Sequence, residues 1–186
     1  MTSIDDSDSN TAQVGVTAAS MDLSGRQYLL IAIGDAPGTT AKVDKWARDL
    51  ASAHRAVALY SLPDGAGVED LIDASTVGVR IMISGAEAEV MRAVAVARAA
   101  GILPCELFIH ISHVDVINVF CPHCDTATRA LARPDHTIEC SGCARDLLVR
   151  PHTSSHRAMY LASVAWRPTG DHPCTSIPSR LWSEVP

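Results

Sequence analysis

Two Cys-x-x-Cys pairs constrain this chain more than any other feature. Cys121 and Cys124 form the first pair, and Cys140 and Cys143 form the second after an interval of fifteen residues. Each pair can direct two thiolates at one centre, and four thiolates at this spacing are typical of a tetrahedral zinc site. We therefore expect a zinc ribbon in which all four cysteines are metal ligands.

The donor set also predicts what the metal does. Four protein ligands leave no open coordination position, so we expect a structural ion rather than a catalytic one. A unit of about 30 residues buries too little apolar area to fold alone, and metal binding would supply the missing free energy. Gly142 would allow a tight turn that brings backbone N–H groups near the thiolates. A rubredoxin-like iron site, a redox dithiol and four unligated cysteines remain as alternatives.

The other cysteines and the histidines are weaker candidates. Cys105 opens a predicted strand and is expected to be a buried core residue, whereas Cys174 lies in a Pro-rich tail. His152 and His156 are four residues apart and could share a helical face, but no carboxylate motif accompanies them. For these two histidines we expect surface hydrogen bonds or capping. His123 lies inside the first cysteine pair, where thiolates already supply the donors.

Composition excludes several classes of function. The 186-residue chain has a net charge of −6, which makes it a poor general binder of phosphate backbones. Its hydrophobic content of 47% is sufficient for a packed core. No apolar run approaches the roughly 20 residues of a membrane-spanning helix. The acidic, polar N-terminus lacks the features of a signal peptide, so we expect a cytoplasmic protein in which paired cysteines bind metal.

The first half of the chain shows alternating strand and helix patterns. The continuous apolar run at residues 28–33 predicts a strand buried on both faces, and Val43, Trp46 and Leu50 form one stripe of the helix that follows. Further strands are predicted at residues 57–60, 79–83 and 107–111, with helices at 68–74 and 86–100. Strands separated by helices imply a small, doubly wound parallel sheet of the α/β class.

These patterns divide the chain into four segments. Residues 1–25 are expected to be a disordered acidic arm, and residues 26–118 an α/β domain. Residues 119–166 would form the zinc-ribbon domain, and residues 167–186 a Pro-rich tail with little periodicity.

The order of elements at residues 28–111 resembles the nicotinamide-binding domain of ferredoxin reductases. Such domains have a Gly-Gly-x-Gly-x-x-Pro turn after the first strand, which lets phosphates approach helix amides. Here residues 34–38 read Gly-Asp-Ala-Pro-Gly, and Ser84 replaces the cysteine that follows the third strand in such reductases. Glu87 and Glu89 would themselves favour the helix N-terminus and repel a phosphate. We therefore expect the scaffold without its dinucleotide site, and assign no cofactor-binding residue.

A degenerate reductase-like domain followed by a four-cysteine ribbon resembles the small DmmA-like subunit of bacterial dimethylamine monooxygenase. The resemblance covers residues 27–165 and departs from the family pattern at Thr153, Ser155 and His156, where an aromatic and basic residues are usual. The residues that carry it are the two cysteine pairs, residues 84–101, Leu147–Arg150, His152, Ser154 and Tyr160.

The resemblance implies an accessory subunit without catalytic residues of its own. The whole complex would oxidatively demethylate dimethylamine or a similar secondary amine with NADPH and O₂, releasing formaldehyde. NADPH, flavin, an iron–sulfur cluster and haem would be bound by reductase and oxygenase partner subunits. The zinc ribbon and apolar edges of this chain would dock onto those partners. The residues agree, since they contain no recognisable acid–base pair or nucleophile motif.

Two other functions remain open at this point. A nucleic-acid-binding zinc ribbon is suggested by mildly basic composition, since residues 121–167 contain six arginines and four acidic residues, but aromatic residues for base stacking are scarce there. A dithiol redox enzyme would use Cys121 and Cys124. It would need a lowered thiol pKa at a helix N-terminus, and a second cysteine pair would be superfluous.

Overall fold

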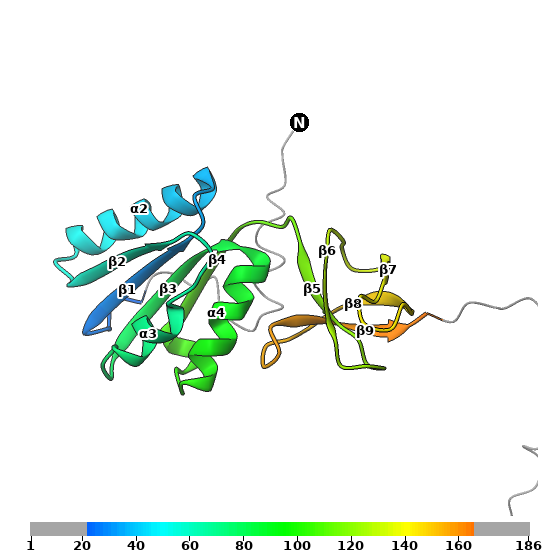
Figure 1. The fold of residues 1–186 in the computed structure, drawn as a ribbon. Helices are drawn as coiled ribbons and strands as arrows, with labels where there is room; N and C mark the ends of the chain where they lie inside the picture. Colours follow the sequence, from blue (N-terminus) through cyan, green and yellow to red (C-terminus); the bar gives the residue numbers. More distant parts are fainter. Residues whose placement is uncertain (1–21, 166–186) are drawn as a thin grey trace, which may run out of the picture.

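The computed structural model describes residues 22–165, which form two β-sheets, one after the other along the chain (Figure 1). The first sheet is entirely parallel and has the strand order β2-β1-β3-β4. Its strands are β1 (Gln27–Ile33), β2 (Val57–Leu62), β3 (Val79–Ala86) and β4 (Leu107–His113). The predicted α/β class with a parallel sheet is confirmed.

Helices cover both faces of the first sheet (Figure 1). Helix α2 (Pro37–Ser52) packs Val43, Trp46 and Leu50 against one face, as the predicted stripe requires. Helices α3 (Val68–Asp73) and α4 (Glu87–Ala99) cover the opposite face. Because helices lie on both sides, the six successive residues 28–33 of β1 are all buried, which explains its continuous apolar run.

The chain reverses its direction across the first sheet between β1 and β3. From β1 it moves outward to β2, and then it crosses back past β1 to β3. The carboxyl ends of β1 and β3 therefore flank the point where ligands bind in open α/β sheets. We call this place the switch point.

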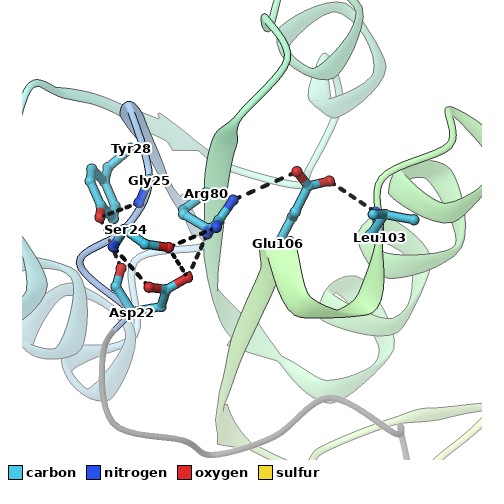
Figure 2. A network of polar contacts seen from close by, with 7 residues as sticks. All are labelled: Asp22, Ser24, Gly25, Tyr28, Arg80, Leu103 and Glu106. Carbon is cyan, nitrogen blue, oxygen red and sulfur yellow. Dashed lines mark hydrogen bonds and ion pairs between the residues drawn. The ribbon is translucent and has the colours of Figure 1, made fainter.

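A polar network fixes the amino-terminal end of the described chain to the first sheet (Figure 2). Asp22 accepts hydrogen bonds from the side chains of Ser24 (2.9 Å) and Arg80 (2.8 Å), and these bonds lower the pKa of Asp22 to about 2. The Tyr28 hydroxyl donates to the Asp22 carbonyl (2.9 Å), and Arg80 also pairs with Glu106 (3.6 Å). Asp22 and Ser24, which the sequence analysis assigned to the arm, are thus bonded to β3 and β1.

The second sheet contains five short strands in the order β6-β5-β9-β8-β7. Strands β5 and β9 pair in parallel, and the other neighbours pair antiparallel. Its strands are β5 (Ile117–Phe120), β6 (Ala127–Ala130), β7 (Thr137–Glu139), β8 (Asp146–Ser154) and β9 (Met159–Val164). Val119, Leu147 and Val149 are fully buried between these strands, next to Cys121 and Cys140. This arrangement is compatible with the predicted ribbon.

Two polar contacts connect the second sheet to α4. The Tyr160 hydroxyl on β9 donates to Glu87 Oε1 at 2.8 Å, and both side chains are buried. Arg129 on β6 pairs with Glu89 at 3.0 Å. The first turn of α4 is therefore the place where the two sheets are fastened together.

Residues 1–21 and 166–186 lie outside the described residues, and so do the predicted tail and Cys174. Between residues 22 and 165, none of the helices has the length and apolar character needed to cross a membrane.

Candidate metal centre

The four predicted ligands come together at one end of the second sheet. The sulfur atoms of Cys121, Cys124, Cys140 and Cys143 all lie within 4.8 Å of one another. The Sγ atoms of Cys121 and Cys143 are 3.8 Å apart, and those of Cys124 and Cys140 are 3.6 Å apart. These separations are far longer than the roughly 2.05 Å of a disulfide bond, so the sulfurs are not paired covalently.

The two cysteine pairs are built on the same backbone turn. Cys121 follows β5 and Cys140 follows β7, and the carbonyl of each accepts a hydrogen bond from the N–H group four residues later. These donors are Asp125 (3.0 Å) and Ala144 (2.9 Å), whose φ angles of 57° and 54° lie in the left-handed region. Each turn thus contains one non-glycine residue in a conformation that L-residues adopt at an energetic cost.

Gly142 fits the second turn for reasons of space as well as hydrogen bonding. Its N–H donates to the Cys140 sulfur at 3.4 Å, which confirms the predicted approach of the backbone to a thiolate. A Cβ at this position would lie 2.9 Å from Thr126 Cβ and 3.2 Å from Cys124 Sγ. The absence of a side chain therefore lets the two turns approach each other closely.

The thiols influence one another's protonation. Burial raises the pKa of Cys140, but hydrogen bonds from the backbone of Gly142 and Cys143 and from neighbouring thiols outweigh it and lower the value to about 6. The backbone N–H of Arg145 lowers the pKa of Cys143, but burial and the three other thiols raise it to about 12. With a pKa this high, Cys143 would keep its proton at neutral pH, and a divalent ion among the four sulfurs would stabilise its thiolate form.

Two of the sulfur separations match those of a tetrahedral four-sulfur metal site. Metal–sulfur distances of about 2.3 Å place the sulfurs of a tetrahedral zinc site about 3.8 Å apart. The observed separations of 3.6 and 3.8 Å agree with this value. Four cysteines could therefore hold a metal ion here with no coordination position left for a substrate.

His152, His156 and Cys105 do not belong to the metal-binding cluster. His152 lies in β8 and His156 in the turn that follows it, both exposed, so the expectation that they could share a helical face is wrong. Within residues 22–165, no second cluster of metal-ligating side chains accompanies the four cysteines. Cys105 is exposed, contrary to the predicted core position. It lies in the short 3-10 turn η2 (Pro104–Glu106), and Leu107 takes the first buried position of β4.

The switch point of the first sheet is acidic. A cavity of about 300 Å³ opens there between the ends of β1, β2 and β4 and the first turn of α4. Four acidic side chains line it, together with His113 and with Arg129 from β6. The four are Asp35, Asp64, Glu89 and Asp115. An excess of carboxylates at this place disfavours the pyrophosphate of a dinucleotide.

Glu87 and Glu89 occupy the first turn of α4, as predicted. The helix N-terminus therefore already has two carboxylates next to its free N–H groups. Two contacts of these residues were not predicted from the sequence. Glu87 is buried and accepts a hydrogen bond from the Tyr160 hydroxyl, and Glu89 pairs with both Arg92 (3.1 Å) and Arg129 (3.0 Å). The sequence position of Glu87 could have indicated such a contact, because a carboxyl group that directly follows a buried strand needs a hydrogen-bond partner.

Ser84 also has a local role. It is fully buried at the end of β3, and its hydroxyl lies 3.0 Å from Nδ1 of His110 on β4. Burial lowers the pKa of His110, and the nearby Lys42 lowers it further. Trp46 packs against the same imidazole edge-on. Ser84 thus belongs to the packing between two strands and α2.

Two comparisons with known proteins give related descriptions. Residues 118–163 match the family described as dimethylamine monooxygenase subunit DmmA-like, C-terminal domain. The chain is also 37% identical over 112 residues to the heme-dependent oxidative N-demethylase delta subunit of Ectopseudomonas mendocina (strain ymp). That alignment covers 56% of this chain and 63% of the relative. No solved structure matches the chain. The resemblance to DmmA-like small subunits is thereby confirmed.

Proposed function

From this resemblance to DmmA-like small subunits, we propose that the chain is an accessory, non-catalytic subunit of a multicomponent amine monooxygenase. The observation that carries the proposal is the likeness to an oxidative N-demethylase delta subunit, together with the match of the cysteine-containing region to the DmmA-like domain. The complex acts on dimethylamine or a similar secondary amine, with NADPH and O₂ as co-substrates, in the cytoplasm.

Zn²⁺ is the proposed metal, with Cys121, Cys124, Cys140 and Cys143 as its ligands. Support comes from the four sulfur donors and from the two sulfur separations of 3.6 and 3.8 Å, which suit a tetrahedral ion. The ion supplies no reactive position, since all four coordination sites are taken by protein. Its contribution is to hold two turns together in a sheet of short strands, where little apolar area is buried.

The oxidative cofactors belong, in this proposal, to partner subunits that bind flavin, an iron–sulfur cluster and haem. Two features of the first sheet support this assignment. Carboxylates line the switch-point cavity, and Glu87 and Glu89 occupy the helix N-terminus that would otherwise hold a phosphate. The first sheet and the zinc ribbon serve instead as a scaffold on which the reductase and oxygenase subunits dock.

Affinity purification from the source organism, with a tag on this chain, tests the proposal. We expect a reductase subunit and a haem oxygenase subunit to co-purify, and the preparation to oxidise NADPH only when a secondary amine is present. A chain that purifies alone, and whose deletion leaves amine oxidation unchanged, would contradict the subunit role. Binding to DNA or RNA that weakens steeply with added salt would favour the nucleic-acid-binding alternative.

The metal assignment and the proposed division into domains at residues 118/119 are tested together by Cys140→Ser. We expect loss of the metal and unfolding of the second sheet, while the first sheet keeps its secondary structure. Cys105→Ser is the matched control, since Cys105 is exposed and distant in sequence from the cluster. If Cys140→Ser kept one zinc ion per chain, the assignment of the four cysteines as ligands would be wrong. If both sheets unfolded together in this variant, the division into two domains would be wrong.

A further inference from the structure

The two polar contacts between the second sheet and α4 both start beside a metal-binding turn. The first contact comes from Tyr160, whose hydroxyl donates to Glu87. Tyr160 pairs across the sheet with Val119 of β5, and β5 runs directly into Cys121. Tyr160 also belongs to the buried cluster that contains Cys121 and Cys140. Its position at α4 therefore depends on the same packing that positions two of the four sulfurs.

The second contact comes from Arg129, which pairs with Glu89 and directly follows Thr128 in β6. The Thr128 side chain is buried, and its hydroxyl accepts a hydrogen bond from the N–H group of Ser141 at 3.1 Å. The hydroxyl oxygens of Thr128 and Ser141 are 3.2 Å apart. Ser141 lies inside the second Cys-x-x-Cys pair. The strand that carries Arg129 is thus bonded to the second metal-binding turn.

Apolar packing alone gives these strands little support. Strands β5 and β6 contain four residues each, and β7 contains three. Within residues 22–165, eight buried residues form the core cluster of the second sheet, and two of them are the ligands Cys121 and Cys140. A unit this small gains much of its folding free energy from its metal. Loss of the metal would therefore remove the order of β5 and β6 on which both contacts with α4 depend.

We infer that metal binding and attachment of the second sheet to α4 form one coupled equilibrium. The second sheet is fastened to the first turn of α4 only while the metal is bound, and this attachment in turn strengthens metal binding. Linkage requires both effects to have the same size. Arg129 also lines the switch-point cavity beside four acidic side chains, so loss of the metal leaves that cavity more negative. The inference rests on the proposed zinc site and not on the proposed subunit role.

The reverse effect gives the sharper test, because it predicts that a substitution in the first sheet's helix weakens zinc binding. Glu87→Ala removes the acceptor of the Tyr160 hydroxyl without changing any residue of the second sheet. Glu69→Ala is the matched control, since Glu69 is an exposed glutamate in the first turn of α3. In competition with a chelator, we expect Glu87→Ala to weaken zinc binding by the about 5–150-fold typical of coupled sites. Zinc affinity in the control should stay within about twofold of the wild-type value, as expected for a surface substitution.

A double-mutant cycle separates the contact itself from other effects of Glu87→Ala. Tyr160→Phe should weaken zinc binding in the wild-type background, but by less than about twofold in the Glu87→Ala background, because the contact is already absent there. Glu89→Ala should have a smaller effect than Glu87→Ala, less than about fivefold, since the pair that it breaks is solvent-exposed. Equal zinc affinities of Glu87→Ala and Glu69→Ala would overturn the inference.

Hydrogen–deuterium exchange of the wild-type chain tests the forward effect and requires no variant to fold. Amides at residues 91–94 bond to carbonyls of the first turn of α4, so detachment of the second sheet should expose them more often. After removal of zinc with a chelator, we expect these amides to exchange more than about fivefold faster, while those of β1 keep their rates. Unchanged exchange in α4 would overturn the inference and leave the zinc site intact. A wild-type chain that binds no zinc would instead overturn the proposed metal site.

Discussion

The buried contact between Tyr160 and Glu87 gives the sharpest test of how the two sheets are joined. In Tyr160→Phe, a carboxylate that is 1% exposed loses the hydroxyl that donates to it at 2.8 Å. Removing the donor from a buried hydrogen-bonded acceptor costs about 1–3 kcal/mol. In a chain of this size each kcal/mol shifts the melting temperature by about 2–4 °C, so we expect a decrease of about 2–12 °C.

Thermal unfolding followed by circular dichroism, with zinc bound throughout, measures this decrease. Tyr60→Phe is the matched control, because Tyr60 is 43% exposed and its substitution should change stability by less than about 0.5 kcal/mol. In a double-mutant cycle with Glu87→Gln, the coupling energy should lie between about 0.5 and 3 kcal/mol. A melting temperature for Tyr160→Phe equal to that of Tyr60→Phe would refute the claim that this bond fastens the second sheet to α4.

Three further substitutions test other parts of the structure. Asp22→Asn should destabilise the chain at pH 7, because folding lowers the pKa of Asp22 from 3.8 to about 2 and so favours its ionised form. Urea titrations should show the difference in unfolding free energy between wild type and variant vanish as the pH falls from about 4 to about 2. Ala144→Gly should raise the melting temperature through a gain of about 0.5–1 kcal/mol, since φ is 54° there; a decrease would contradict this. Gly142→Ala should weaken zinc binding in competition with a chelator, because its Cβ would crowd Thr126 and Cys124; unchanged affinity would show that the turns have room to relax.

Local patterns predicted much of this fold. The stripe of Val43, Trp46 and Leu50 identified the buried face of α2, and the helix predicted at residues 86–100 is α4, which ends at Ala99 shortly before Gly101 with a φ of 88°. The cysteine cluster was predictable for the same reason, since each Cys-x-x-Cys pair is formed by one local turn.

Long-range contacts were not predictable in this way. Glu87 and Tyr160 are 73 residues apart in the sequence, and only the tertiary fold brings them together. The position of Cys105 was misjudged because a short turn before β4 cannot be distinguished from the first residue of a strand by apolar pattern alone. Within residues 22–165, β2 is exposed because it lies at an edge of the first sheet, and no local pattern reports the place of a strand in its sheet.

The central claim is that this chain is a zinc-stabilised accessory subunit whose catalytic cofactors are bound by its partners. Native mass spectrometry of the complex, purified through a tag on this chain, tests it most directly. We expect an intact assembly that contains reductase and oxygenase subunits. After gentle dissociation, this chain should retain one zinc ion and the partners should retain flavin and haem. A chain that is recovered alone, that lacks zinc, or that itself retains flavin or haem would contradict the account.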